Sequence, residues 1–277
     1  MKDVTIIVTT FERPEFAIKC VESIRQFYPN IIIVISDNGK GRPVLRKTLG
    51  RKYKCQYLGL PFDCGASRAR NEGFKVANTK YVVLCEDDFR FTEETRLESL
   101  RDILETDPAL GMAGGACLKN GNSGIIGSNF TFDREKEIFY RDPVRKPDWK
   151  ETNGTRYYYC DYIRMFFMTR NIPELYFFDE DFSAGGNHTS GLIEIKIQDK
   201  WRIAYVPDVN LIHDHSFSWA NENYIKYRSR RRQDWGLFYK KTGFRFAVFD
   251  RKRVRDHKQK VTFTYPEFKS KLDKGEF

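Results

Sequence analysis

Three consecutive acidic residues, Glu86, Asp87 and Asp88, follow the short apolar run Tyr81–Cys85. Such a run predicts a strand that is buried on both faces of a parallel sheet. Open α/β sheets bind ligands at the carboxyl ends of their strands. Carboxylates crowded there repel one another unless a cation or ligand hydroxyls compensate, and oxygen ligands of this kind suit Mg²⁺ or Mn²⁺. The alternative is a charged loop in which Asp87 caps a turn.

Polar residues also end three other expected strands. Thr9–Arg13 follows Val4–Val8, Asp37 follows Ile31–Ile35, and His213 follows a strand near residue 206. A nucleotide needs such a set, because a carboxylate can accept hydrogen bonds from a base or ribose while arginines and a divalent cation offset the phosphates. Neither G-x-G-x-x-G after the first strand nor G-x-x-x-x-G-K-[ST] occurs. Phosphate neutralisation by a metal is therefore favoured over a glycine-rich loop.

The elements that position these residues alternate along the first half of the chain. They are expected to be strand Val4–Val8, a helix from Pro14, strand Ile31–Ile35, a short helix Val44–Leu49, strand Cys55–Leu58, a helix after Gly65, strand Tyr81–Cys85 and a helix from Thr92. This alternation predicts an α/β fold with a Rossmann-like, mostly parallel sheet flanked by helices.

After residue 108 the pattern changes. Residues 119–163 alternate polar turns with aromatic segments, which predicts hairpins of a mixed sheet. The other expected elements are strand Gly111–Leu118, helix Ser190–Asp199, strand Ile203–Val206 ending at Pro207, and one long helix from about Asn221 to Lys241. Beyond Phe249 the chain is basic and poorly patterned, which favours a mobile tail.

Composition limits the class of protein. With 277 residues, 40% of them hydrophobic, the chain can bury a large core. No apolar run approaches the roughly 18 residues of a membrane span, and the N-terminus leads directly into a strand. The six cysteines form no C-x-x-C pair, and Cys20, Cys85 and Cys117 are expected to be buried thiols in a cytoplasmic protein. The net charge is +10, and much of the excess lies in residues 226–260, including Arg230–Arg232. Such a region suits a phosphorylated substrate, anionic lipid or nucleic acid.

Several segments match a known family in order and spacing. V-T-I-I-V-T-T-F-E-R-P, S-D-N-G, G-A-S-R-A-R-N-E-G and K-Y-V-V-L-C-E-D-D-F together resemble the nucleotide-binding half of family 2 glycosyltransferases with the GT-A fold. F-Y-P-N-I-I-I-V-I-S-D-N and L-P-F-D-C-G are similar to animal β-1,4-N-acetylgalactosaminyltransferases. The resemblance implies a nucleotide-sugar-binding half over residues 1–108 and an acceptor-binding half over residues 109–243. Residues 244–277 lie beyond it and are expected to be a basic C-terminal tail.

The resemblance also implies roles for individual residues. Asp37 would hold uracil, Arg70 would face the phosphates, and Asp88 and His213, rather than His215, would bind Mn²⁺ or Mg²⁺. The residues expected to bind the nucleotide sugar are Thr9, Phe11, Arg13, Asp37, Arg70, Glu86, Asp87 and Arg228.

The segment F-D-E-D-F-S-A-G-G-N-H departs from the family at one position. It resembles the acceptor-side segment that ends G-E-D in the family, but Asn187 and His188 stand where the catalytic aspartate is expected. An inverting transferase needs a base that deprotonates the acceptor hydroxyl, and histidine can serve near neutral pH. The catalytic candidates are His188, Glu180 and Asp181, with Asp179 as a further alternative.

Together these features predict a metal-dependent inverting glycosyltransferase that moves a sugar from a UDP-sugar to a hydroxyl of a glycan or glycolipid. GalNAc, GlcNAc or another hexose derivative is the expected sugar, and cell-surface polysaccharide synthesis is the expected context. The basic C-terminal region would allow peripheral contact with an anionic membrane at its inner face. One alternative is an inactive nucleotide-sugar-binding protein. A second is a basic nucleic-acid-binding protein, but no nucleic-acid partner is expected because no recognised motif is present. A third is a nucleotidyltransferase, which the lack of a glycine-rich phosphate loop disfavours.

Overall fold

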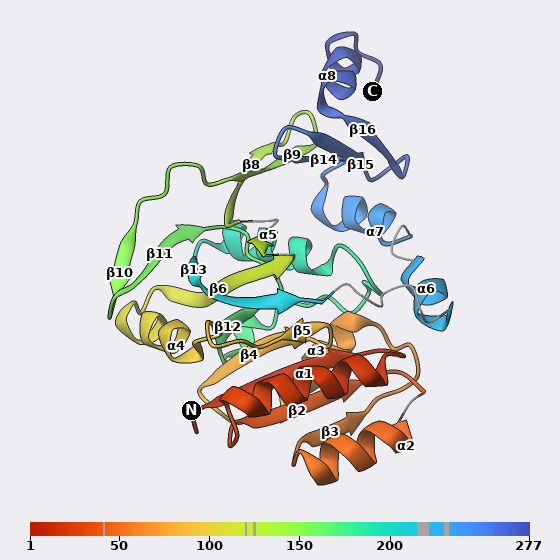
Figure 1. The fold of residues 1–277 in the computed structure, drawn as a ribbon. Coiled ribbons are helices and arrows are strands. Elements are labelled where there is room, and N and C mark those ends of the chain that lie inside the picture. Colours follow the sequence, from red (N-terminus) through yellow and green to blue (C-terminus); the bar gives the residue numbers. More distant parts are fainter. Residues whose placement is uncertain (41, 120, 124–125, 215–221, 230–232) are drawn as a thin grey trace.

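The computed structural model describes residues 1–277 except 41, 120, 124–125, 215–221 and 230–232 (Figure 1). Its first half contains, in order, β1 (Val4–Thr10), α1 (Pro14–Phe27), β2 (Ile32–Asp37), α2 (Arg42–Leu45), a π-helical turn (Arg46–Lys52), β3 (Gln56–Gly59), α3 (Ala66–Val76), β4 (Tyr81–Glu86), β5 (Phe89–Arg90) and α4 (Leu97–Thr106). The predicted alternation of strands and helices is confirmed up to β4.

The second half adds strands to the same sheet and builds another. It contains β6 (Leu110–Lys119), β7 (Asn122–Ser123), β8 (Ser128–Asp133), β9 (Ile138–Pro143), β10 (Lys150–Thr152), β11 (Thr155–Cys160), β12 (Phe167–Arg170), a 3₁₀ turn (Pro173–Leu175), α5 (Asn187–Gln198), β13 (Arg202–His213), α6 (Glu222–Arg228), α7 (Gln233–Thr242), β14 (Phe246–Phe249), β15 (Arg253–Asp256), β16 (Val261–Thr264) and α8 (Tyr265–Asp273).

The order of the central sheet brings four strand ends to one edge. Its strands follow each other as β10-β11-β13-β6-β12-β4-β1-β2-β3 in the described part of the chain. Strand β1 is parallel to β2 and β4. Strand β12 is antiparallel to both β4 and β6, and β13 is parallel to β6. Strand β13 therefore runs in the same direction as β4, so the carboxyl ends of β1, β2, β4 and β13 share one edge.

Two hydrophobic cores cover the faces of this sheet. In β1, Val4, Ile6 and Val8 pack on one face with apolar residues of α1 and α4. Ile7 points to the other face and joins the core that contains Phe74 of α3 and residues of α5. Each such side chain contributes about 1.5–3 kcal/mol when it is fully buried. Burial on both faces explains why the first strands are apolar at almost every position.

Helix α3 lies directly against β1 and β2. A Cβ atom added at Gly73 would lie 2.6 Å from Cγ2 of Ile7 and 3.0 Å from Oγ of Ser36, so a larger residue would push the helix away. This close approach places the first turns of α3, including Arg70, beside the end of β4.

Helix α4 begins at Leu97 and not at Thr92 as predicted. Residues 89–90 form β5, which pairs with the end of β13, and Thr92 and Thr95 then close a turn. The Thr92 N–H donates to Oγ1 of Thr95 at 2.8 Å, and that hydroxyl donates to the carbonyl of Asn210 at 2.7 Å. The tertiary pairing with β13 thus overrides the helical pattern of the sequence.

Two elements near the C-terminus differ from the prediction. Strand β13 does not end at Pro207 but continues to His213, with a register shift between Val206 and Asn210 that accommodates the proline. The single long helix expected from Asn221 to Lys241 is instead α6 and α7. The arginine run 230–232 lies outside the described residues.

Residues 244–277 are folded, so the prediction of a mobile tail is wrong. Strand β14 pairs in parallel with β9, and the second sheet has the order β16-β15-β14-β9-β8. Ile138 packs with Phe246, Val254 and Phe268 in a core of its own. Figure 1 shows this sheet and α8 at the opposite end of the molecule from β1, β2 and β3.

The three cysteines Cys20, Cys85 and Cys117 are buried free thiols, which confirms the prediction for them.

Candidate active site

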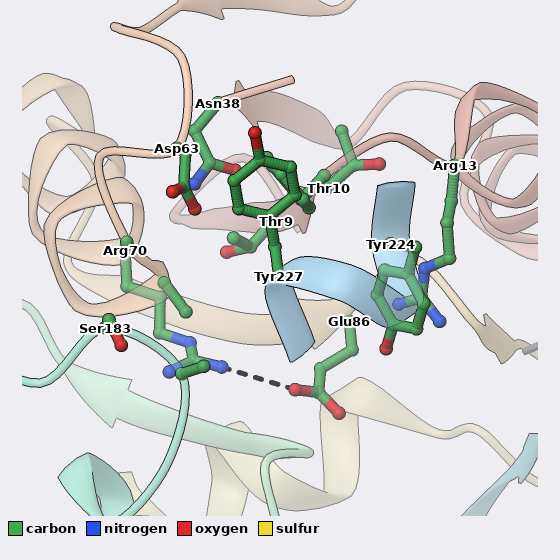
Figure 2. A pocket seen from close by; sticks show the side chains of 14 residues that line it. Thr9, Thr10, Arg13, Asn38, Asp63, Arg70, Glu86, Ser183, Tyr224 and Tyr227 are labelled. Atoms are coloured by element: carbon green, nitrogen blue, oxygen red, sulfur yellow. Dashed lines mark hydrogen bonds and ion pairs between the residues drawn. The ribbon is translucent and has the colours of Figure 1, made fainter. Parts of the chain in front are cut away.

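A pocket opens at the edge where the strand ends meet (Figure 2). The empty space inside it is about 610 Å³, which includes open solvent at the mouth. Residues at the strand ends, in the loops before α3 and α5, and in α6 line it. They are Thr9, Thr10, Phe11, Arg13, Asn38, Asp63, Gly65, Ala66, Arg70, Glu86, Ser183, Ala184, Tyr224 and Tyr227. The structure thus brings five of the predicted nucleotide-binding residues into one pocket: Thr9, Phe11, Arg13, Arg70 and Glu86.

Arg70 supplies positive charge to one wall of the pocket. Its Nη2 lies 3.2 Å from Oε1 of Glu86, and its guanidinium lies 5.0 Å from the ring centroid of Phe178. Figure 2 shows this pair below the aromatic side chains of the pocket. An arginine held in this way can turn its remaining N–H groups to phosphate oxygens without losing much conformational freedom.

Asn38, and not Asp37, faces the ligand space at the end of β2. Both oxygens of Asp37 are used within the protein, since Oδ1 accepts from Gly39 N–H at 2.8 Å and Oδ2 accepts from the Tyr57 hydroxyl. Asn38 lines the pocket and is 4% exposed, and its Oδ1 has no hydrogen-bond partner among the described residues. Buried acceptors without a partner are rare in proteins. The contact of Asp37 with the base therefore stays a prediction, and Asn38 is a second candidate for that contact.

Aromatic rings form another wall. The Phe11 and Phe62 centroids lie 5.7 Å apart, and Tyr227 of α6 lies 5.4 Å from Phe11 and 5.3 Å from Phe62. Tyr224, one helical turn earlier, lies 4.3 Å from the guanidinium of Arg13. Helix α6 therefore completes the pocket with apolar ring faces, on which a flat base can stack. Arg228 is in the same helix, but its side chain lies outside the described part of the structure.

Asp87 has an internal role. It is fully buried, it accepts from Oγ1 of Thr10 at 2.7 Å, and it pairs with the guanidinium of Arg13. Burial raises the pKa of Asp87, while Arg13 and Thr10 oppose that rise. Asp87 was expected to bind the nucleotide sugar, but it is buried and does not line the pocket. It holds Arg13, whose Nη1 also lies 3.0 Å from Oδ2 of Asp88.

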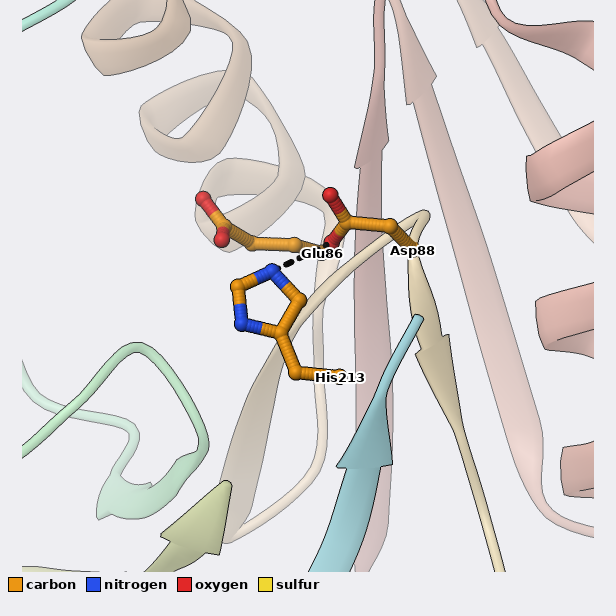
Figure 3. A group of neighbouring side chains, drawn as sticks. All are labelled: Glu86, Asp88 and His213. Atoms are coloured by element: carbon orange, nitrogen blue, oxygen red, sulfur yellow. Dashed lines mark ion pairs between the residues drawn. The ribbon is translucent and has the colours of Figure 1, made fainter. Parts of the chain in front are cut away.

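Glu86, Asp88 and His213 form a group suited to a metal ion (Figure 3). One ligand atom from each lies within 4.8 Å of the other two. The cause is the pairing of β5 with β13, which sets Phe89 opposite His213 and places Asp88 beside the imidazole. Nε2 of His213 lies 3.5 Å from Oδ1 of Asp88.

The chemistry of this group fits a divalent cation. Two carboxylates and an imidazole are a donor set that suits Mn²⁺. Burial raises the pKa of Asp88, but the neighbouring His213 and Arg13 outweigh it and lower the pKa to about 2. Asp88 is therefore ionised at neutral pH and can act as a ligand, and the metal-binding role of Asp88 and His213 stays a prediction. Glu86, which was expected to bind the nucleotide sugar, lies beside them.

His188 does not lie in the pocket. It follows the first residue of α5, is 8% exposed, and stacks on Phe167 with the ring centroids 6.0 Å apart. Its Nε2 lies 2.7 Å from the carbonyl oxygen of Ile163, so this nitrogen carries the proton and donates. Burial lowers the pKa of His188 to about 3. A group enclosed in the core cannot reach an acceptor hydroxyl, and the structure contradicts the prediction that His188 is the base.

The other two catalytic candidates lie in the turn that leads to Ser183. Glu180 accepts from Nδ2 of Asn71 at 3.0 Å. Asp181 is exposed and pairs with Lys241, which lowers its pKa. Neither side chain lines the pocket. Their catalytic role stays a prediction.

Buried histidines make the stability of the protein dependent on pH. Burial lowers the pKa of His257 to about 3, as it does for His188, and both imidazoles are neutral in the folded protein. In the unfolded chain they titrate near pH 6.5, so below that pH the unfolded state binds more protons. We expect each histidine to reduce stability by about 1.4 kcal/mol per pH unit between pH 6 and 4.

Urea unfolding from pH 8 to pH 4, for the wild type and for His188→Gln, measures this effect. The variant should show a shallower loss of stability as the pH falls. Parallel curves for the two proteins would contradict a buried neutral His188.

Comparison with known proteins now decides the family. The model of glycosyl transferase family 2 matches residues 5–169, more than half of the chain. The chain belongs to glycosyl transferase family 2. Human beta-1,4 N-acetylgalactosaminyltransferase 1 is 41% identical over 113 residues, which cover 41% of this chain and 20% of the human protein. The mouse protein is 34% identical over 163 residues, 54% of this chain and 29% of its own length. The match therefore spans less than a third of these relatives.

Solved structures of glycosyltransferases share the fold of this family 2 chain. The structure of GalNAc-T7 with UDP, GalNAc and Mn²⁺ superposes with a TM-score of 0.62 at 15% identity, covering 86% of this chain and 50% of that one. The mannosyltransferase PcManGT from Pyrobaculum calidifontis, in complex with GDP-Man and Mn²⁺, gives a TM-score of 0.56 at 17% identity, covering 86% and 63%. These likenesses confirm the predicted GT-A fold.

Proposed function

We propose that this family 2 chain is a metal-dependent glycosyltransferase that moves a sugar from a UDP-sugar to a hydroxyl of a glycan or glycolipid. The observation that carries the proposal is the group of Glu86, Asp88 and His213 at the edge of the pocket that the strand ends form. GalNAc is the first candidate sugar because the sequence relatives are N-acetylgalactosaminyltransferases. GlcNAc or another hexose derivative is the alternative.

The side-chain amide of Asn38 suits a nucleotide whose base carries an N–H group beside a carbonyl group. Its carbonyl can accept from N3–H of uracil while its amide N–H donates to a uracil carbonyl oxygen. The pocket-lining rings of Phe11 and Tyr227, which pack against Phe62, supply the stacking faces. UDP is proposed over GDP because the GalNAc-T7 structure holds UDP and GalNAc.

The charges of the pocket suit a departing diphosphate. A cation held by Asp88, His213 and Glu86 would offset the negative charge that develops on the leaving group. Arg70 adds a positive charge on the same side. Because this charge is in place before the reaction, it stabilises the negative charge that develops in the transition state more than it stabilises the ground state. Ser183 and Ala184 are small, so the wall near Arg70 leaves room for the sugar. We expect the acceptor hydroxyl to attack the anomeric carbon from the opposite face, with inversion, as family 2 membership suggests.

The C-terminal sheet supports contact with an anionic surface. Residues 244–277 hold ten lysines and arginines against five aspartates and glutamates. In the described part of the chain, no helix has both the length and the apolar character that crossing a bilayer requires. We propose peripheral attachment through the basic residues of this sheet, which would bring the pocket near a glycolipid acceptor.

Thermal melting with a panel of nucleotide sugars tests the proposed function. In the presence of Mn²⁺, UDP-GalNAc or UDP-GlcNAc should raise the melting temperature, with about 2.7 kcal/mol of stabilisation at a hundred times the Kd. GDP-mannose should have a smaller effect. Slow release of UDP from the nucleotide sugar that stabilises the protein would exclude an inactive binding protein. Stabilisation by GDP-mannose alone, or by no nucleotide sugar, would contradict the proposal.

Asn38→Ala should weaken UDP binding about 10- to 100-fold, because a buried hydrogen bond to the base is lost. Asp37→Asn is the matched control. It should lower the stability of the protein through the Gly39 and Tyr57 contacts but leave UDP affinity nearly unchanged. Calorimetric titration of both variants with UDP and Mn²⁺ measures this. If Asp37→Asn loses UDP and Asn38→Ala retains it, the base contact belongs to Asp37.

A further inference from the structure

The loop Ser183–Gly185, which supplies two residues of the pocket wall, donates hydrogen bonds to the carboxylate of Asp234, which lies 51 residues after Ser183 in the chain. Asp234, in the first turn of α7, accepts from the N–H of Ala184 at 2.9 Å and of Gly185 at 2.8 Å. It also accepts from the hydroxyl of Ser183 at 3.2 Å and from its N–H at 3.4 Å. Three successive backbone N–H groups thus point to one carboxylate.

These hydrogen bonds are shielded from water. Asp234 is 5% exposed. Hydrogen bonds from N–H groups to an ionised carboxylate are stronger than those between neutral groups, particularly where solvent is excluded. Asp234 therefore fixes the path of the loop backbone more firmly than the two glycines of S-A-G-G would do by themselves.

The same loop is held from the opposite side by the start of α3. The Ala66 N–H donates to the carbonyl of Ser183 at 3.0 Å, and Oγ of Ser67 donates to the carbonyl of Phe182 at 3.1 Å. Gly65 has φ +89°, and a Cβ at this position would lie 3.4 Å from Cα of Ser183. The loop is enclosed between α3 of the nucleotide-binding half and α7, which lies more than 160 residues later in the chain.

Figure 2 locates the part of the pocket that this loop bounds. Ser183 lies beside Arg70 and its ion pair with Glu86, whereas Asn38 and Asp63 lie at the other end of the pocket. The wall held by Asp234 is on the Arg70 side of the pocket, where the proposed function puts the phosphates and sugar of the donor.

We propose that Asp234 is a positioning residue that fixes the Ser183–Gly185 wall against the sugar of the donor. The role in donor binding rests on the proposed function, whereas the hold on the loop does not. Through Asp234, the placement of α7 sets the space available to the sugar without any direct contact between α7 and the reacting atoms.

Asp234→Asn tests the proposal with two measurements. Asparagine keeps the size of the side chain but loses the charge and places an N–H₂ group against the loop N–H groups. Hydrogen–deuterium exchange should show at least tenfold faster exchange of the amides of Ala184 and Gly185, a result that does not depend on any ligand. In titrations with Mn²⁺, the affinity for UDP should change less than threefold, while the affinity for UDP-GalNAc and the rate of UDP release from it should fall 10- to 100-fold.

Asp256→Asn is the matched control. Asp256 is also buried and also accepts from two backbone N–H groups, those of Lys258 and Gln259, but it lies in the second sheet. This control should lose stability without faster exchange at Ala184 and without a change in the ratio of UDP-GalNAc to UDP affinity.

The outcomes separate the two claims. Unchanged exchange at Ala184 and Gly185 in Asp234→Asn would overturn the proposal, and so would faster exchange with an unchanged ratio of UDP-GalNAc to UDP affinity. Equal losses of UDP and UDP-GalNAc affinity would also overturn it, because they indicate general damage to the pocket. If the wild type binds neither ligand, the proposed function fails, and the assignment of Asp234 to the donor sugar fails with it.

Discussion

Asp88→Ala should abolish Mn²⁺-dependent UDP binding and lower the rate of sugar transfer by about 10³-fold or more. Asp88 is buried, ionised and adjacent to His213, so it is the strongest anionic ligand of the group. Its loss leaves one carboxylate and one imidazole, too few to retain a cation against water. His213→Ala should weaken metal-dependent binding less, by about 10- to 100-fold, since a neutral ligand is lost.

Titration of UDP with and without Mn²⁺ checks both variants. Glu105→Gln is the control, because Glu105 forms an exposed ion pair with Lys80 at the start of β4, the end far from the pocket. It should behave as the wild type does. An Asp88→Ala protein that still bound UDP more tightly with Mn²⁺ would show that the metal ligands lie elsewhere.

Arg13→Met should destabilise the fold by about 3–5 kcal/mol, the usual cost of removing one partner of a buried ion pair. Arg13 is the cationic partner of the fully buried Asp87 and also contacts Asp88. Methionine keeps the apolar part of the side chain, so the loss of stability measures the contribution of the charge and its hydrogen bonds. Urea unfolding at pH 7.5 gives the free energy of unfolding.

The double variant Arg13→Met/Asp87→Asn provides the internal control. With the Asp87 carboxylate removed as well, only Asp88 still lacks its contact with Arg13, and we expect about half of the lost stability to return. A single Arg13→Met variant within about 1 kcal/mol of the wild type would show that Asp87 does not depend on this arginine.

The first half of the fold could be predicted from the sequence because its signals are local. The apolar runs around Ile6, Val34 and Val83 are short and bounded by turn residues, and strands buried on both faces have this pattern. Consecutive acids after such a run also showed where ligand groups would gather. The sequence did not show which partner each of these acids contacts. Asp87 turns inward to Arg13, whereas Glu86 and Asp88 face His213.

The remainder depends on contacts between distant residues. The pairing of Phe89 with His213 shortened the expected helix and brought His213 to Glu86 and Asp88, and no local pattern reveals it. His188 was expected at the acceptor, but aromatic residues of other elements enclose it. Asp234 resembles an ordinary acid in the first turn of a helix.

The C-terminal sheet was missed for a different reason. Strands β14, β15 and β16 hold only four residues each, and β14 pairs with β9 from the middle of the chain. One local signal was available there. Thr264 and Glu267 form a capping box, and the T-x-x-E spacing that marks it is visible in the sequence.

Calorimetric titration of the wild-type protein with UDP, in Mn²⁺ and then in EDTA, tests the central claim most directly. We predict one binding site whose affinity falls at least tenfold when the metal is removed, together with weaker binding of GDP under both conditions. Equal UDP affinity in Mn²⁺ and EDTA, or no binding of UDP in either, would contradict a metal-dependent UDP-sugar transferase.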